Sequence, residues 1–198
     1  MKKILPTLFL AAVFPLIQGC AGGLIVAAGA AVALNSDERS VAQQLSDEEL
    51  SVSALDKLNE LKLDNKKMRI NFISNSGYLL IVGQVENQDT SNRIEQQLNT
   101  IEEAKGIYNQ LRIMAPISFT QQTKDSWLTT KVKSQLTAHE QVDPLKIKVV
   151  TENAEVFLVG KVTREMADDA TNVSRKVDGV KQVNRVFQFI EEKPQTEK

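Results

Sequence analysis

The chain has 198 residues, of which 42% are hydrophobic and 25% are charged, and its formal net charge is −1. This composition is typical of a globular protein and excludes both a disordered chain and a protein with many membrane spans. The small net charge also excludes binding of a polyanion by the chain as a whole. Any electrostatic preference must therefore come from a local patch.

The N-terminus has the form of a bacterial lipoprotein signal peptide. Two lysines precede an apolar run from Ile4 to Ile17, which is too short for a bilayer-spanning helix. The run ends in Gln18-Gly19-Cys20, which resembles a lipobox. The resemblance implies that residues 1–19 are removed and that Cys20 carries acyl chains such as palmitate. Ala21 then implies sorting to the outer membrane, with the protein anchored on its periplasmic face.

Residues 20–45 are interpreted as the lipidated cysteine and a linker. The Gly/Ala-rich stretch 21–34 would reach only about 21 Å as a helix, so it cannot span a bilayer core of about 30 Å. It either lies against the lipid surface or acts as a tether. At the other end of the chain, residues 191–198 are polar and are predicted to form a frayed, solvated tail.

The remainder of the chain consists of an internal repeat. Residues 68–85 align with residues 145–162, so that Val82-Gly83 falls on Val159-Gly160. The similarity extends on both sides of this segment. It predicts two domains of about 70 residues, at 46–115 and 124–190, joined by a linker at 116–123.

Each repeat is predicted to fold in the order αββαβ. In the second repeat, Leu128, Val132 and Leu136 recur at the spacing of an amphipathic helix. In the first, Ser46 and Glu49 have the spacing of a capping box at a helix start. Two β-rich runs with a hairpin turn, a second helix (about 88–104 and 164–178) and a final strand follow. A strand–helix–strand crossover makes that strand parallel, which predicts an α+β fold with a three-stranded mixed sheet packed by two helices.

The repeats resemble BON domains. Each contains an aliphatic–Val-Gly-x-Val strand, at 82–85 and 159–162, and the second adds Asp178-Gly179-Val180 before its last strand. A lipobox followed by two such units is similar to dual BON-domain outer-membrane lipoproteins. The resemblance implies membrane-associating modules that bind anionic phospholipid through the second domain. It also implies enrichment at cell division sites and a role in outer-membrane integrity.

The single tryptophan is predicted to point away from the core of its own domain. At about 100° per residue, Trp127 lies about 140° from the centre of the stripe of apolar residues. Lys131, Ser134 and Ala138 fall beside it, and Lys124 joins them if the helix starts early enough. In the first repeat the position of Trp127 is taken by Glu49. Residues 46–115 carry eight basic and eleven acidic groups, whereas residues 124–190 carry eleven and nine, so only the second domain is net basic.

This face is the candidate site for an anionic phospholipid, such as phosphatidylglycerol or cardiolipin. Tryptophan is favoured at the level of lipid headgroups, and lysine is attracted to anionic lipid. Two other interpretations stay open: Trp127 packs against the first domain, or it binds a protein such as a component of the outer-membrane assembly machinery. The predicted phospholipid-binding residues are Lys124, Trp127, Lys131, Ser134 and Ala138.

The sequence offers little for catalysis, so a non-enzymatic protein without cofactor or metal is expected. His139 is the only histidine, so it can form no pair with another. The acidic groups at 47–49 and 168–169 are interpreted as solvated faces or helix starts. Gly83 and Gly160 are interpreted as sites of close backbone packing. The periplasmic compartment argues against nucleic acid as a partner.

Overall fold

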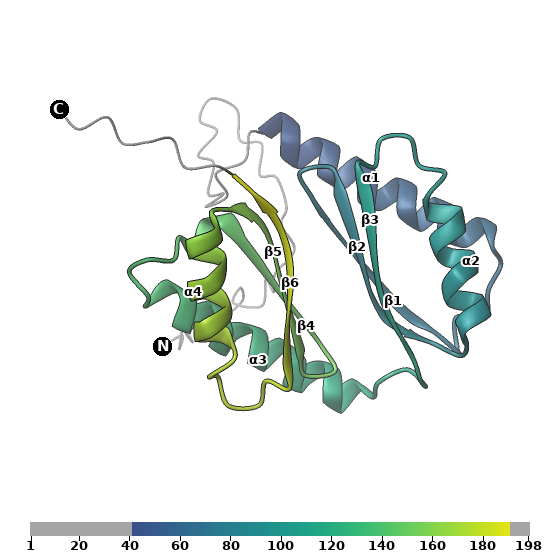
Figure 1. Ribbon diagram of the computed structural model, residues 1–198. Helices are drawn as coiled ribbons and strands as arrows, with labels where there is room; N and C mark the ends of the chain where they lie inside the picture. The colour runs from purple at the N-terminus through teal and green to yellow at the C-terminus, as the bar shows by residue number, and fades with distance from the viewer. Residues whose placement is uncertain (1–40, 191–198) are drawn as a thin grey trace, which may run out of the picture. The chain divides into compact units, whose positions relative to one another are not determined.

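The computed structural model describes residues 41–190. The predicted signal peptide, Cys20, most of the linker and the C-terminal tail lie outside these residues. The first repeat contains α1 (Val41–Glu60), β1 (Arg69–Asn75), β2 (Tyr78–Val85), α2 (Gln88–Leu98) and β3 (Gly106–Ile113) (Figure 1). The second contains α3 (Phe119–Thr137), a 3-10 turn η1 (Pro144–Lys146), β4 (Ile147–Glu152), β5 (Glu155–Val162), α4 (Arg164–Ser174) and β6 (Gln182–Phe189).

The predicted fold class is confirmed, because each repeat forms a three-stranded mixed sheet with two helices. In the first sheet β2 is central, antiparallel to β1 and parallel to β3. The second sheet repeats this arrangement with β5 between β4 and β6. The helices of each domain lie on one face of its own sheet (Figure 1). The parallel strand is the one that follows the crossover helix, as expected.

Two helices begin earlier than the sequence patterns indicate. Helix α1 starts at Val41, so Ser46 lies inside it and the predicted capping box is wrong. Helix α3 starts at Phe119, and the hydroxyl of its N-cap residue Ser118 accepts a hydrogen bond from the Gln121 N–H. Several residues of the expected linkers are therefore helical, and Lys124 belongs to α3. Helices α2 and α4 end at residues 98 and 174, earlier than expected, because turns follow them.

Aspartates inside α1 and α3 hold the two hairpin turns. The carboxylate of Asp47 accepts hydrogen bonds from the N–H groups of Ser76 and Gly77, each at 2.9 Å. Asp125 accepts in the same way from the residues at 153 and 154, at 2.7 and 2.9 Å. All four turn residues have positive φ. The side chain of Asp47 is therefore a buried turn cap, and its interpretation as part of a solvated acidic face is wrong.

The helix-facing side of each sheet forms the core of its own domain. In the first domain, alternate residues of β2 point toward α1 and α2, as the period of a strand requires. The buried residues of this core are Leu50, Ala54, Leu58, Leu79, Ile81, Val85, Ile94, Leu98, Ile101 and Leu111. Those of the second core are Leu128, Val132, Leu136, Val142, Ile147, Val149, Ala154, Val156, Leu158, Val162, Ala167 and Ala170.

The opposite sheet faces meet in a third apolar cluster, which was not predicted from the sequence. Leu80 and Val82 of β2 pack in one buried cluster with Phe157 and Val159 of β5 and with Val186 of β6. Both central strands are consequently buried on both faces. Uninterrupted apolar runs, at 79–82 and 156–159, are typical of such strands and were the available signal.

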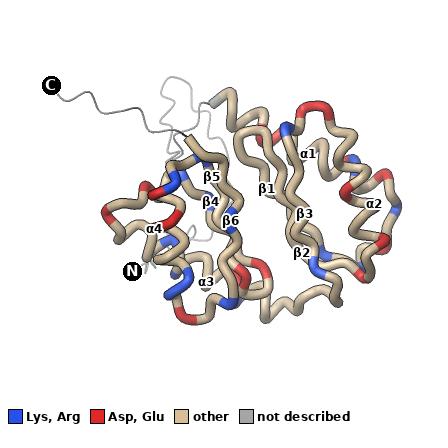
Figure 2. Tube along the Cα trace, in the orientation of Figure 1, with Lys and Arg blue, Asp and Glu red and all other residues tan. Residues whose placement is uncertain are grey.

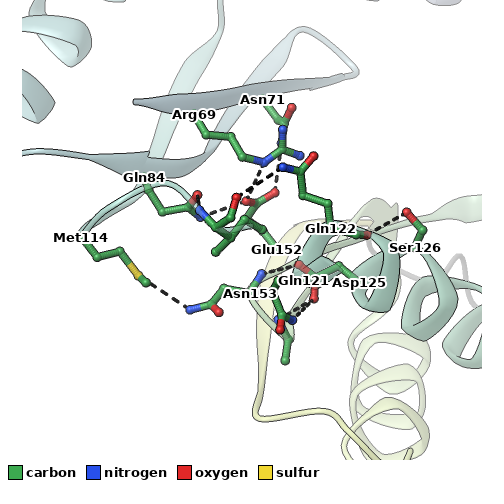
Figure 3. A network of polar contacts seen from close by, with 12 residues as sticks. Arg69, Asn71, Gln84, Met114, Gln121, Gln122, Asp125, Ser126, Glu152 and Asn153 are labelled. Atoms are coloured by element: carbon green, nitrogen blue, oxygen red, sulfur yellow. Dashed lines mark hydrogen bonds and ion pairs between the residues drawn. The ribbon is translucent and has the colours of Figure 1, made fainter. Parts of the chain in front are cut away.

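A buried carboxylate links the two domains beside this cluster. Glu152 accepts hydrogen bonds from Arg69 Nε at 3.1 Å, Asn71 Nδ2 at 3.0 Å and Gln84 Nε2 at 2.9 Å (Figure 3). Its side chain is only 6% exposed. A buried charge is tolerated when it is both paired and hydrogen-bonded, as this one is.

A second ion pair connects the domains at a more accessible place. Arg112 donates to Glu155 through Nε at 3.1 Å and Nη2 at 2.6 Å, and Asn184 donates to the same carboxylate at 3.3 Å. These hydrogen bonds, those of Arg112 above all, hold the pKa of Glu155 below its ordinary value. The same pair raises the pKa of Arg112.

Glu155 is therefore expected to contribute to the acid sensitivity of the protein. Because its pKa is lowered by folding, its stabilising effect is complete above the ordinary carboxyl pKa of about 4.3 and is lost as pH falls through the folded pKa. Thermal denaturation between pH 7 and pH 3 should show a smaller drop in melting temperature for Glu155→Gln than for the parent chain. Equal drops in the two proteins would contradict the expectation.

Candidate functional site

Helix α3 turns one face to its domain and presents Trp127 on the other. Its buried positions are Asp125, Leu128, Val132 and Leu136, whereas the side chain of Trp127 is 65% exposed. In the described chain the ring therefore fills neither the core of its own domain nor the contact between the domains. The buried residues Asp125 and Leu128 lie on either side of it in sequence, so the helix period alone turns the ring outward.

The other predicted site residues lie on or beside the same face. Lys124 and Ser134 are exposed, and Ala138 is the exposed C-cap residue that ends α3. Lys131 is half-buried, and its Nζ donates to the carbonyl oxygen of Asp178 at 3.0 Å.

Phe119 belongs to this surface but was not predicted. Its side chain is 82% exposed, the largest value among the exposed large hydrophobic residues of the described chain. Phe119 was expected in the linker at 116–123, because the N-cap at Ser118 was not recognised. Phe119 and Trp127 are eight residues apart in one helix, which separates them by about 12 Å along its axis.

Hydroxyl side chains lie between the two aromatic residues. Thr123, Ser126 and Thr130 each donate a hydrogen bond to the carbonyl four residues earlier, at 3.0 to 3.1 Å. These hydroxyl donors are satisfied within the helix, which lowers the cost of removing them from water. We call this surface the docking face; its residues are Phe119, Thr123, Ser126, Trp127, Thr130 and Ser134.

The docking face contains no charged residue, and lysines flank it. By the helix period, Lys124 and Lys131 lie on one flank and Lys133 on the other. Basic positions also lie near the end of α4, beside α3 (Figure 2). The docking face is thus an uncharged strip with lysine on both sides, and the stems of these lysines can extend along apolar surface.

A groove runs between α3 and the end of α4. Its volume is about 490 Å³, and it is open to solvent along one side. One wall is formed by α3 and the other by α4 and the turn that follows it. The lining residues are Trp127, Thr130, Lys131, Ser134, Gln135, Val173, Lys176, Val177 and Asp178.

The matching helix of the first domain has a different outer surface. Leu45, Val52 and Leu55 of α1 are each about half exposed, at 50, 56 and 49%. Glu48 and Glu49 lie exposed on the same helix. The acidic groups at 47–49 were interpreted as a solvated face or a helix start, and the exposed apolar residues beside them were not predicted.

Within residues 41–190, no cluster of three or more metal-ligating side chains is present. None of the helices over the same residues is long and apolar enough to cross a membrane.

The family model named BON domain matches residues 46–115 and 124–191. Together these matches cover more than half of the chain. The chain belongs to the BON-domain family. The family resemblance inferred from the Val-Gly-x-Val strands is thus confirmed.

Two relatives share this BON-domain chain over most of its length. Outer membrane lipoprotein DolP of Haemophilus influenzae is 35% identical over 178 residues, covering 88% of this chain and 91% of that protein. The 21 kDa hemolysin of Actinobacillus pleuropneumoniae is 35% identical over 155 residues, covering 78% and 80%. The first relationship supports an outer-membrane lipoprotein of the DolP type, with two BON domains.

Among solved structures, the C-terminal domain of CdsD, a structural protein of the type III secretion system of Chlamydia trachomatis, covers 69% of this chain and 96% of its own. The TM-score is 0.30 at 12% identity. A likeness this weak carries no argument about function.

Proposed function

We propose that this BON protein is a non-enzymatic lipoprotein that binds anionic phospholipid through the docking face of α3. Lipidated at Cys20, it would stay on the periplasmic side of the outer membrane and support membrane integrity, with enrichment at division sites. Phosphatidylglycerol and cardiolipin are the expected lipids. The observation that carries the proposal is the 65% exposed ring of Trp127 on an uncharged helix face with lysine flanks.

The expected binding free energies favour weak, reversible contact between the docking face and the membrane. Burying an aromatic ring contributes roughly 1.5–3 kcal/mol, and a lysine near an anionic surface adds about 1 kcal/mol. An acyl anchor at Cys20 would confine the domain near the membrane and raise the effective concentration of the docking face. Phe119 increases the apolar area available for insertion.

Replacing Trp127 with alanine should weaken binding to anionic vesicles about tenfold or more, because burying one large aromatic ring contributes at least about 1.5 kcal/mol. The measurement is co-sedimentation of the chain from Ala21 onward with phosphatidylglycerol-containing vesicles at rising salt. Binding of the parent chain should fall with ionic strength and be absent with neutral vesicles.

Tyr108→Ala is the matched control, since it removes another exposed aromatic residue from a different domain. It should bind vesicles like the parent, and circular dichroism should show that both variants are folded. The proposal would be contradicted if the Trp127 and Tyr108 variants bound vesicles equally well. It would also be contradicted if the parent chain bound neutral and anionic vesicles equally well.

A second candidate function is that of an adaptor for an envelope protein, such as an outer-membrane assembly component. The exposed Leu45, Val52 and Leu55 of α1 favour it, because the neighbouring carboxylates would be repelled by anionic lipid. Protein contact through this stripe should be little affected by lipid charge, whereas docking through α3 requires it.

A further inference from the structure

We propose that the groove between α3 and the end of α4 binds the headgroup of a single phospholipid, with Lys131 and Lys176 holding its phosphodiester. The inference rests on the proposed lipid-binding function and makes it more specific. Contact through the docking face alone would be a diffuse surface interaction, whereas a headgroup in the groove would be a saturable site.

The two lysines come from different elements and reach the same groove. The Nζ of Lys131 donates to the carbonyl oxygen of Asp178 at 3.0 Å, which fixes its stem along the groove. An ammonium group has three donors, so two remain for a ligand. The side chain of Lys176 makes no ion pair or hydrogen bond with another described residue, and it lies on the opposite wall.

The charge of the groove fits a phosphodiester. Lys131 and Lys176 supply two positive charges and Asp178 one negative charge, which leaves one positive charge for a monoanionic ligand. The carboxylate of Asp178 is an acceptor for the hydroxyl groups of a headgroup such as glycerol. Val173 and Val177 provide an apolar wall suited to the glycerol backbone and the first methylenes of the acyl chains.

The first domain provides an internal comparison. When the two repeats are aligned, Lys131 corresponds to Ser53 and Lys176 to Thr100. The second correspondence is supported by the equivalent backbone hydrogen bonds in the turns after α2 and α4. Neither lysine of the groove has a basic counterpart there. The groove chemistry therefore belongs to the same domain as the docking face.

The test uses dihexanoyl phosphatidylglycerol below its micelle concentration, titrated into the chain from Ala21 onward and followed by amide chemical shifts. Residues on both walls should shift together and saturate at one lipid per chain. Lys176→Gln should weaken this binding about fivefold, the effect expected for one lysine near a phosphate. Lys161→Gln loses the same charge from an exposed position of β5 that does not line the groove, and it should leave binding unchanged.

Absence of saturation, or equal losses in the Lys176 and Lys161 variants, would overturn the inference. Equal binding of inorganic phosphate would also overturn it, because the groove would then bind a free anion without specificity for a lipid headgroup. Vesicle co-sedimentation separates this failure from that of the proposed function. If vesicle binding still depends on Trp127 while binding of the soluble lipid does not saturate, the proposed headgroup site in the groove is wrong. Lipid binding through the docking face would then still be supported.

Discussion

Replacing Gly83 with alanine is expected to lower the free energy of unfolding by about 3 kcal/mol or more. A Cβ at this position would lie 2.8 Å from the carbonyl carbon of Arg69 and closer still to its oxygen. These atoms belong to the backbone of the neighbouring strand β1, so they cannot move without opening the sheet. The φ angle of Gly83 is +133°, which L-residues rarely adopt, and this adds backbone strain.

Chemical denaturation followed by far-UV circular dichroism would measure the loss. Gly106→Ala is the matched control in the same sheet. There the new Cβ would meet the ring of Tyr78 at 3.1 Å, and a side chain can shift where a backbone cannot. The control should lose clearly less stability; a Gly83 variant as stable as the Gly106 variant would refute the steric argument.

Replacing Arg69 with methionine is expected to destabilise the protein by about 3–5 kcal/mol. The substitution preserves apolar bulk but leaves the carboxylate of Glu152 without its cationic partner. That carboxylate is 6% exposed, so water can solvate it only weakly once the positive charge of Arg69 is removed. Asn71 and Gln84 would still donate to it, yet neutral donors compensate only in part for a buried charge.

The additional substitution Glu152→Gln should restore part of the stability in the Arg69→Met background, since it removes the unpaired charge. Lys67→Met serves as the control, because Lys67 forms an exposed ion pair with Glu86, with side chains 58 and 52% exposed. Exposed pairs contribute little, so this control should denature close to the parent chain. If the Arg69 and Lys67 variants lost stability equally, the buried hydrogen bonds to Glu152 would contribute no more to stability than an exposed ion pair.

The order of the helices and strands could be predicted because local sequence patterns indicate it and both repeats contain these patterns. The β-rich runs, their turn signals and the crossover helix recur in both repeats, so each supports the interpretation of the other. The outward position of Trp127 followed from the helix period alone. These features depend on residues that are near one another in sequence.

The features that were missed depend on contacts between distant residues. Asp47 was interpreted as solvated because nothing near it in sequence indicates that a turn at residues 76–77 closes over its carboxylate. The aligned Asp125, before a similar turn, was the one available hint. Likewise Glu152 looks like an ordinary polar strand end, and its burial is caused by donors more than 60 residues away in sequence.

The apolar cluster between the two sheets affects how this protein can be dissected. Each sheet has helices on one face and the other domain's strands on the second, so Leu80, Val82, Phe157 and Val159 are covered only while both domains are present. A truncated protein with one domain would expose an apolar sheet surface to water and would tend to aggregate. Loss of function after deleting one domain would then reflect misfolding of the remaining half. Point substitutions on the outer helix faces are the cleaner way to assign roles to each half.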